Sequence, residues 1–255
     1  MIMKDEQLLR YSRQIMLPQV DIAGQQAFLD SHMVIVGVGG LGSPAAMYLA
    51  AAGVGSLTLV DDDVVELSNL QRQLAHAESD IGKSKAESAA STLRGINSET
   101  KVHVVNRRVG AAELSQLISC ADVVLDATDN LDTRFAINRA CLSAGIPLVS
   151  GAAIRLEGQI AVFDSRVSTS PCYECLYKAG EGGDLTCADN GVLAPVVGIV
   201  GSMQALEALK LIGEFGESLV GRLLLLDAST MQWREMKLPR DPDCAACGTI
   251  EESPA

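Results

Sequence analysis

A glycine-rich segment that follows an apolar run most constrains what this chain can fold into. Residues 33–36 read Met-Val-Ile-Val, which is typical of a strand buried on both faces. The pattern Gly37-x-Gly39-x-x-Gly42 follows, and residues 43–53 are small and helix-compatible. Glycines let a backbone turn sharply and approach a ligand closely, and a helix N-terminus presents unpaired N–H groups to an anion. The segment therefore predicts a phosphate-binding turn.

A second strand supports a nucleotide site. Residues 56–60 read Ser-Leu-Thr-Leu-Val and are followed by Asp61, where the dinucleotide fingerprint places an acid that holds the ribose. The alternative is a tight turn that only packs a helix on a sheet. Because the glycines lie between two strands and an acid follows, we favour the nucleotide site.

The remaining apolar runs predict an α/β fold. We expect a Rossmann-like, doubly wound, mostly parallel sheet with antiparallel C-terminal strands, and a core of aliphatic residues because aromatics are only 4% of the chain. Strands are predicted at residues 102–105, 122–126, 147–150, 158–164, 222–227 and 233–238, and helices at 4–16, 21–31, 85–93, 111–120, 131–144 and 192–213.

We expect residues 1–248 to form a single domain, since 255 residues suffice for one α/β core with appendages. Its expected parts are a helical arm (1–31), a nucleotide-binding core (32–164), a crossover loop (165–191) and a C-terminal part (192–248), followed by a disordered tail (249–255).

Charge and hydropathy exclude some classes of protein. A net charge of −12 argues against general nucleic-acid binding, which needs a basic face. Residues 1–7 lack the apolar core of a signal peptide. The apolar window 192–212 contains Pro195, Glu207 and Lys210, so it favours a buried helix over a membrane span. We expect a cytoplasmic protein.

Polar residues after Asp61 suggest chemistry other than hydride transfer. Within residues 68–73, Asn69, Gln71 and Arg72 are placed to reach the crevice at the strand ends, whereas a hydride-transfer enzyme has no evident use for them. The alternative is a hydrated loop with a helix cap at Ser68.

The segment Gly82-Lys83-Ser84-Lys85 is a near miss of a P-loop, and we reject that motif because Ala77 stands at the first glycine position and no strand precedes it. Either one of these lysines points into the crevice from the start of a helix, or both are solvated.

Asp129 and Asn130 follow the predicted strand 122–126, at the edge where open α/β sheets place their chemistry. A carboxylate there, beside phosphates, is a natural Mg²⁺ ligand. The same pair is also a common helix cap, and a helix is predicted directly after it. Cap alone and cap plus ligand both remain open.

Two Cys-x-x-Cys units predict a structural zinc site. Cys172 and Cys175 with Cys244 and Cys247 supply the four thiolates of a closed tetrahedral site, which would staple the crossover loop to the C-terminal part. Redox chemistry is the alternative, although thioredoxin-like motifs open a helix after a strand and neither unit is expected to.

Together these motifs resemble a family, the bacterial adenylyltransferases that activate ubiquitin-like sulfur carriers. The resemblance covers the chain from about Leu9 to Gly248, and it is carried by both Cys-x-x-Cys units and by residues 37–42, 68–73, 126–130 and 151–159. It implies that ATP and Mg²⁺ activate the C-terminal glycine of a small Gly-Gly-ended carrier as an acyl-adenylate, with release of pyrophosphate.

The resemblance also implies roles for individual residues. Gly40 would lie against the nucleotide, Asp61 would hold the ribose, and Asp129 would bind magnesium. Lys85, rather than Lys83, would meet the α-phosphate. The implied nucleotide contacts also include Ser68, Asn69, Leu70, Gln71, Arg72 and Asn130, with Asn69 and Arg72 on the phosphates. From spacing alone Arg13 is a solvated helix residue, but the family delivers a matching arginine from a neighbouring subunit, which implies a homodimer.

Some alternatives remain open after the resemblance. Residues 151–159 favour the carrier of molybdopterin synthase, its small subunit, and the thiamine-pathway carrier is the close alternative. Cys187 is either an ordinary loop thiol or the residue that forms a covalent link to the carrier. A dinucleotide oxidoreductase and a non-catalytic scaffold for a ubiquitin-like partner are the competing functions.

Overall fold

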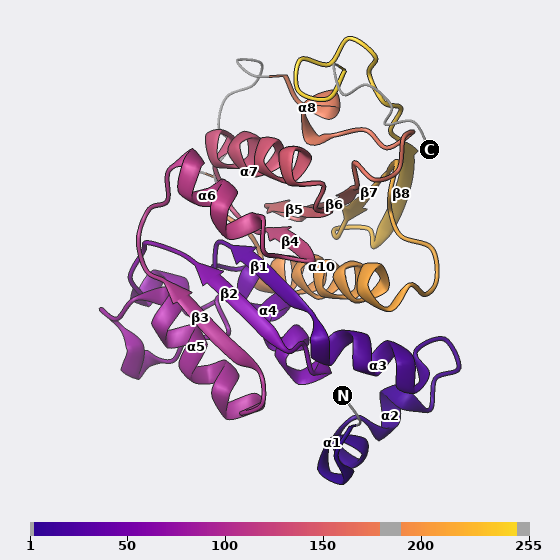
Figure 1. Ribbon diagram of the computed structural model, residues 1–255. Coiled ribbons are helices and arrows are strands. Elements are labelled where there is room, and N and C mark those ends of the chain that lie inside the picture. Colours follow the sequence, from indigo (N-terminus) through magenta and orange to yellow (C-terminus); the bar gives the residue numbers. More distant parts are fainter. Residues whose placement is uncertain (1–2, 179–189, 249–255) are drawn as a thin grey trace.

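One eight-stranded sheet runs through the protein in the order β3-β2-β1-β4-β5-β6-β7-β8 (Figure 1). The computed structural model describes residues 3–178 and 190–248. Neighbours from β3 to β5 pair in parallel, and those from β5 to β8 pair antiparallel. The strands are β1 (His32–Val36), β2 (Ser56–Val60), β3 (Lys101–Val105), β4 (Val123–Asp126), β5 (Leu148–Ile154), β6 (Glu157–Phe163), β7 (Arg222–Asp227) and β8 (Gln232–Lys237).

Helices cover both faces of the sheet, which confirms the doubly wound α/β fold. Figure 1 shows α6 and α7 on one side and α4, α5 and α10 on the other. The helices are α1 (Asp5–Arg10), α2 (Ser12–Ile15), α3 (Asp21–Asp30), α4 (Gly42–Ala52), α5 (Lys85–Ile96), α6 (Ala111–Ile118), α7 (Leu131–Ala144), α8 (Tyr173–Leu176) and α10 (Ala194–Gly213), with 3-10 turns η1 (Leu67–Asn69) and η2 (Glu78–Asp80).

The core has two halves because successive strand residues point to opposite faces. Met33 and Ile35 of β1 pack with α4, α5 and α10, whereas Val34 and Val36 pack with α6 and α7. All four are buried, as a continuous apolar run between two helical layers requires. A fully buried aliphatic side chain of this kind contributes roughly 1.5–3 kcal/mol.

The predicted glycine turn joins β1 to α4. Gly37 has a φ of +86°, which an L side chain rarely adopts. A Cβ on Gly42 would lie 1.9 Å from the carbonyl oxygen of Gly37, so only glycine allows the helix to start this close to the turn. The turn thereby directs the N-terminus of α4 to the end of the sheet where β1, β2 and β4 finish.

Helix α10 is long and apolar enough, by length and composition, to cross a membrane. In this structure it packs instead against α3, α4 and the strands β4, β5 and β6. Glu207 is buried within it, where its carboxylate accepts a hydrogen bond from Leu219 N at 2.8 Å and pairs with Lys210. It is a core helix of the fold, as its charged residues predicted.

The predicted helix 4–16 is wrong in one respect, because it is broken into α1 and α2 at Tyr11. The Tyr11 ring is buried, and its hydroxyl accepts a hydrogen bond from Asn97 Nδ2 at 2.8 Å. This contact from 86 residues away anchors the arm.

The fifth strand is also longer than predicted and forms a hairpin with β6. Residues 249–255 and Cys187 lie outside the described residues.

Candidate functional site: a nucleotide cleft and a cysteine cluster

A cleft of about 920 Å³ opens at the carboxyl ends of β1, β2 and β4 and continues along β5 to β8. Its lining includes six of the predicted site residues: Gly40, Asp61, Arg72, Lys85, Asp129 and Asn130. Within residues 3–178 and 190–248, the lining does not include Arg13, Ser68, Asn69, Leu70 or Gln71. The fold therefore brings together residues from three strand–helix connections: β1 to α4, β2 to the start of α5, and β4 to α7.

Asp61 ties the glycine turn to the end of β2. Its Oδ2 accepts a hydrogen bond from Val38 N at 2.7 Å, and its Oδ1 accepts one from Asp63 N at 2.9 Å. Burial raises the pKa of Asp61, while these two N–H groups oppose the rise. Since each carboxylate oxygen has a second lone pair, Asp61 can hold the turn and still accept a bond from a ligand hydroxyl.

The two lysines of the rejected P-loop have different surroundings. Lys85 is the first residue of α5, is buried, and places Nζ 2.7 Å from Asp63 Oδ2. Lys83 has an exposed side chain that pairs with Asp80. Of the two alternatives left by the sequence, the structure supports one lysine in the crevice, and that lysine is Lys85.

The loop before Arg72 is organised around Asn69. Asn69 is buried, and its Oδ1 accepts a hydrogen bond from Glu66 N at 3.1 Å, which closes the turn η1. Arg72 donates from Nη1 to Ser68 O at 3.0 Å and reaches the cleft. In this arrangement Ser68 holds the guanidinium through its carbonyl oxygen, and residues 68–71 are not part of the described cleft lining.

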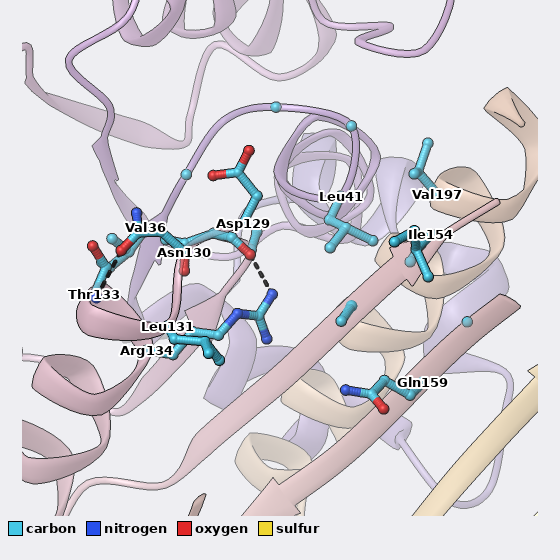
Figure 2. Close-up of a pocket in the computed structure, with 18 of the residues that line it drawn as sticks. Val36, Leu41, Asp129, Asn130, Leu131, Thr133, Arg134, Ile154, Gln159 and Val197 are labelled. Carbon is cyan, nitrogen blue, oxygen red and sulfur yellow. Dashed lines mark hydrogen bonds between the residues drawn. The ribbon is translucent and has the colours of Figure 1, made fainter. Parts of the chain in front are cut away.

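Asp129 and Asn130 have separate tasks. Asn130 is the N-cap of α7, where its Oδ1 accepts a hydrogen bond from Thr133 N at 2.8 Å. The Asp129 side chain lines the cleft and is exposed, and Figure 2 shows its carboxylate pointing away from the Arg134 guanidinium. The cap therefore belongs to Asn130, which leaves the Asp129 carboxylate available to a ligand.

A buried ion pair under this turn was not predicted from the sequence. Arg134 Nη1 lies 3.3 Å from Asp126 Oδ2, and Arg134 Nη2 donates to the carbonyl oxygens of Thr128 and Gly151. Burial lowers the pKa of Arg134, but Asp126 together with Tyr173 and Tyr177 outweighs this effect, so the pKa of the guanidinium is raised. The pair fixes the backbone that carries Asp129. The sequence offered one signal for Arg134. It lies four residues after Asn130, one helical turn along α7, so the two residues share a helix face.

The far end of the cleft was also missed. It is lined by side chains from β6, β7, β8 and the segment after α8, including Gln159, Tyr177, Leu225, Asp227 and Arg234. Here the Gln159 amide donates to the Tyr177 hydroxyl at 2.7 Å and accepts from it at 2.9 Å. This half of the cleft lies beyond the glycine turn, along the antiparallel strands β6 to β8.

The four predicted cysteines form a cluster beside this far end. Sγ–Sγ distances are 3.6 Å for Cys172–Cys244, 3.9 Å for Cys172–Cys175 and 3.5 Å for Cys175–Cys247. Four sulfurs around a tetrahedral zinc with Zn–S near 2.3 Å lie about 3.8 Å apart, whereas a disulfide needs about 2.05 Å. Burial and a hydrogen bond with Cys175 raise the pKa of Cys247 to about 11, whereas the backbone N–H groups of Cys247 and Ala246 lower the pKa of Cys244 against the effect of burial. The donor set fits zinc.

Arg13 lies outside the cleft of its own chain. It is exposed on α2, and its Nη1 contacts Met16 Sδ at 3.9 Å. The arm around it is anchored by Tyr11 and by Gln14, whose Nε2 donates to Ala52 O at 3.0 Å.

Comparisons with known proteins place these features in a family. The family model described as "ThiF family" matches residues 11–246. The molybdopterin-synthase adenylyltransferase of Escherichia coli K12 is 49% identical over 246 residues, which cover 96% of this chain and 98% of that one. The SAMP-activating enzyme E1 of Haloferax volcanii is 48% identical, over 95% of this chain and 89% of its own. The ThiS adenylyltransferase of E. coli K12 is 42% identical, over 99% and 100%.

Among solved structures, the E. coli MccB complex with MccA-N7isoASN has a TM-score of 0.83 at 24% identity, covering 95% of this chain and 75% of that chain. At this identity the likeness concerns the fold alone, and it agrees with the mixed sheet described above. The family model spans nearly all of the described chain and three relatives exceed 40% identity over almost their whole length, so the chain belongs to the ThiF family.

Proposed function

We propose that this protein is an adenylyltransferase that uses ATP to activate the C-terminal glycine carboxylate of a ubiquitin-like sulfur carrier, the small subunit of molybdopterin synthase. The products are a carrier acyl-adenylate and pyrophosphate. The observation that carries the proposal is the 49% identity, over nearly the whole of both chains, to a molybdopterin-synthase adenylyltransferase. The thiamine-pathway carrier is the second candidate, since a ThiS adenylyltransferase is 42% identical.

The geometry of the cleft suits this reaction. A C-terminal carboxylate with a pKa near 3.5 is already ionised at neutral pH, so the reaction needs no general base. The obstacle is repulsion between two anions, which positive groups at the α-phosphate reduce. Lys85 and Arg72 are the two cations that we assign to the phosphates, and Asp61 is assigned to the ribose hydroxyls. Gly40, on the turn, leaves room for the nucleotide.

Magnesium is proposed at Asp129. Mg²⁺ prefers one or two carboxylates together with substrate oxygens and water, and the exposed Asp129 carboxylate in the cleft fits that preference. When bound there, the ion would neutralise charge on the phosphates. As the family resemblance implies, Ser68, Asn69, Leu70 and Gln71 are proposed to contact the nucleotide beside Arg72. Asn130 is proposed to contact it as well as capping α7.

A homodimer is proposed because Arg13 is exposed and lies outside the described lining of its own cleft, whereas the family resemblance assigns a matching arginine to the cleft of a neighbouring subunit. The anchored arm holds Arg13 on the surface, where a second subunit could receive it. Exposed apolar side chains accompany it on the same arm: Leu9, Met16, Leu17 and Ile22. Such side chains favour association with another surface. In this proposal each subunit supplies Arg13 to the cleft of its partner.

Zinc is proposed at Cys172, Cys175, Cys244 and Cys247. With four thiolates the site is closed to water, so the metal would be structural. We also propose that the protein acts in the cytoplasm, with the carrier as its partner and without nucleic acid or membrane.

The experiment that tests the function is ATP–pyrophosphate exchange with the molybdopterin-synthase small subunit and the thiamine sulfur carrier offered side by side. Exchange that depends on only one carrier establishes the chemistry and the pathway. No exchange with either, together with carrier binding that is unaffected by ATP, would favour the scaffold. NAD(P)H binding without exchange would favour the oxidoreductase.

A further inference from the structure

Asp63 is a cleft residue to which the proposed reaction assigns no role. Its Oδ2 accepts a hydrogen bond from Lys85 Nζ at 2.7 Å. The two partners differ in exposure: the Lys85 side chain is only 8% exposed, whereas that of Asp63 is 68% exposed. The buried member of the pair is thus the one assigned to the phosphates.

Main-chain bonds fix the two residues to each other. Lys85 N donates to Asp63 O at 3.0 Å, and Val65 N donates to Lys83 O at 2.8 Å. An isolated antiparallel bridge joins Val64 to Ser84. The strip that follows β2 and the start of α5 therefore move as one piece, and the side-chain pair lies within a rigid frame.

The same strip is joined to the glycine turn. Asp63 N donates to Asp61 Oδ1 at 2.9 Å, and Val38 N donates to Asp61 Oδ2 at 2.7 Å. A continuous chain of bonds thus runs from the glycine turn through Asp61 and Asp63 to the Lys85 ammonium. Asp61 and Asp63 share the strip after β2, which lies between the glycine turn and α5, so Asp63 fixes the position of the Lys85 ammonium relative to the glycine turn.

The charge arrangement explains why a carboxylate is needed at this position. A buried ammonium is costly unless an opposite charge and hydrogen bonds compensate it. An ion pair between two exposed side chains contributes little, but here one partner is buried, so removing the other leaves an uncompensated charge. An ammonium has three donors, and among the contacts of the described residues Asp63 takes one side-chain donor of Lys85. The others can reach phosphate oxygens.

We propose that Asp63 is a positioning residue that holds the Lys85 ammonium at the α-phosphate of bound ATP. This inference rests on the proposed adenylation. Asp63 contacts Lys85 and not the nucleotide. Its negative charge slightly weakens the binding of MgATP, whereas its contact with Lys85 accelerates the reaction.

Asp63→Ala tests this in the carrier-dependent exchange assay. We expect kcat to fall roughly 10- to 100-fold, because the cation is misplaced, while KM for ATP stays the same or falls. Asp63→Glu should restore part of kcat. Glu87→Ala is the matched control: it removes an equal charge from an exposed side chain two residues after Lys85 on α5, and the described cleft lining does not include it, so we expect it to leave kcat close to that of the native protein.

A double-mutant cycle separates positioning from other roles. On the Lys85→Ala background, Asp63→Ala should cause no further loss, since its partner is already gone. A further loss equal to that in the native background would overturn the proposal and indicate a separate role, such as a magnesium ligand, which a raised Mg²⁺ requirement of Asp63→Ala would reveal.

A measurement that does not depend on adenylation keeps the two proposals distinct. Lysine acetylation by acetic anhydride, read by peptide mass spectrometry, should label Lys85 several-fold faster in Asp63→Ala than in the native protein, with Lys83 as the internal reference. Equal labelling of Lys85 in both would overturn the positioning role even if exchange is observed. Absence of exchange in the native protein with faster labelling would overturn the proposed function alone.

Discussion

The two ends of the cleft are held in shape by different kinds of contact. At the nucleotide end, the turn 37–42 and the strip 61–63 are joined by hydrogen bonds that the protein supplies itself. At the other end, Cys172 and Cys244 meet across 72 residues, with 3.6 Å between their sulfurs. The first region is thus held by the protein's own hydrogen bonds, and the second is where we propose that zinc binds. The difference predicts that substitutions at the nucleotide end damage chemistry, whereas those at the cysteine cluster damage stability.

The largest expected effect is that of Asp129→Ala. Because the carboxylate is the proposed magnesium ligand, ATP–pyrophosphate exchange should fall on the order of 10²- to 10³-fold, an effect comparable to removal of one preorganised transition-state contact. The free energy of unfolding should change little, since the side chain is exposed.

Asp132→Ala is the matched control for this change. Asp132 is an exposed carboxylate in the first turn of the same helix, and the cleft lining within the described residues does not include it. Both variants should be compared by exchange rate and by thermal unfolding. Exchange that survives in Asp129→Ala would remove the magnesium role and weaken the contrast between the two ends.

The next largest effect concerns the cysteine cluster. Cys244→Ser should reduce the zinc content from one per chain to well below one and lower stability by about 3 kcal/mol, or roughly 10 °C in Tm, because the remaining thiols lose their cation. MgATP affinity should stay close to that of the native protein, since the nucleotide end has its own hydrogen bonds.

Cys120→Ser is the control for the loss of a thiol, because Cys120 is exposed and lies outside the cluster. Elemental analysis, thermal unfolding and calorimetric titration with MgATP measure the three quantities. Full zinc content in Cys244→Ser would contradict the four-thiolate site, and a large loss of MgATP affinity would contradict the independence of the two ends.

The features that could be predicted from the sequence are each carried by a short motif. The glycine turn, Asp61 and the paired cysteines each follow from a few neighbouring residues and from the physical demands of a turn, a strand end or a metal. The parallel sheet followed from apolar runs alone. Residues 3–178 and 190–248 contain all of these features, and the structure places them as predicted.

What could not be predicted depends on contacts between distant residues. The helix break at Tyr11 coincides with a contact to Asn97, 86 residues away, and the Arg134–Asp126 pair joins α7 to the end of β4. Lys83 and Lys85 share one short segment, and their spacing alone did not decide which of them faces the cleft. The family resemblance implied Lys85, and the packing in the structure separates the buried Lys85 from the exposed Lys83.

The smallest expected effect tests whether the two ends communicate. Tyr177 follows α8, which carries Cys175, and its hydroxyl exchanges hydrogen bonds with Gln159 inside the cleft. Its ring lies 4.8 Å, between centroids, from that of Tyr173, so the aromatic pair connects the cysteine cluster to the cleft wall. Tyr177→Phe keeps this packing and removes only the hydroxyl.

We expect Tyr177→Phe to raise KM for the carrier by a few-fold, corresponding to about 1 kcal/mol for one lost hydrogen-bonding group, while KM for ATP and zinc content stay unchanged. The reason is position: the hydroxyl lies on the half of the cleft beyond the nucleotide turn, where the carrier's tail would approach. Tyr48→Phe is the control, since Tyr48 is exposed on α4 and the described lining does not include it. An altered KM for ATP in Tyr177→Phe would mean that the two ends are one unit, and the contrast between them would then concern stability only.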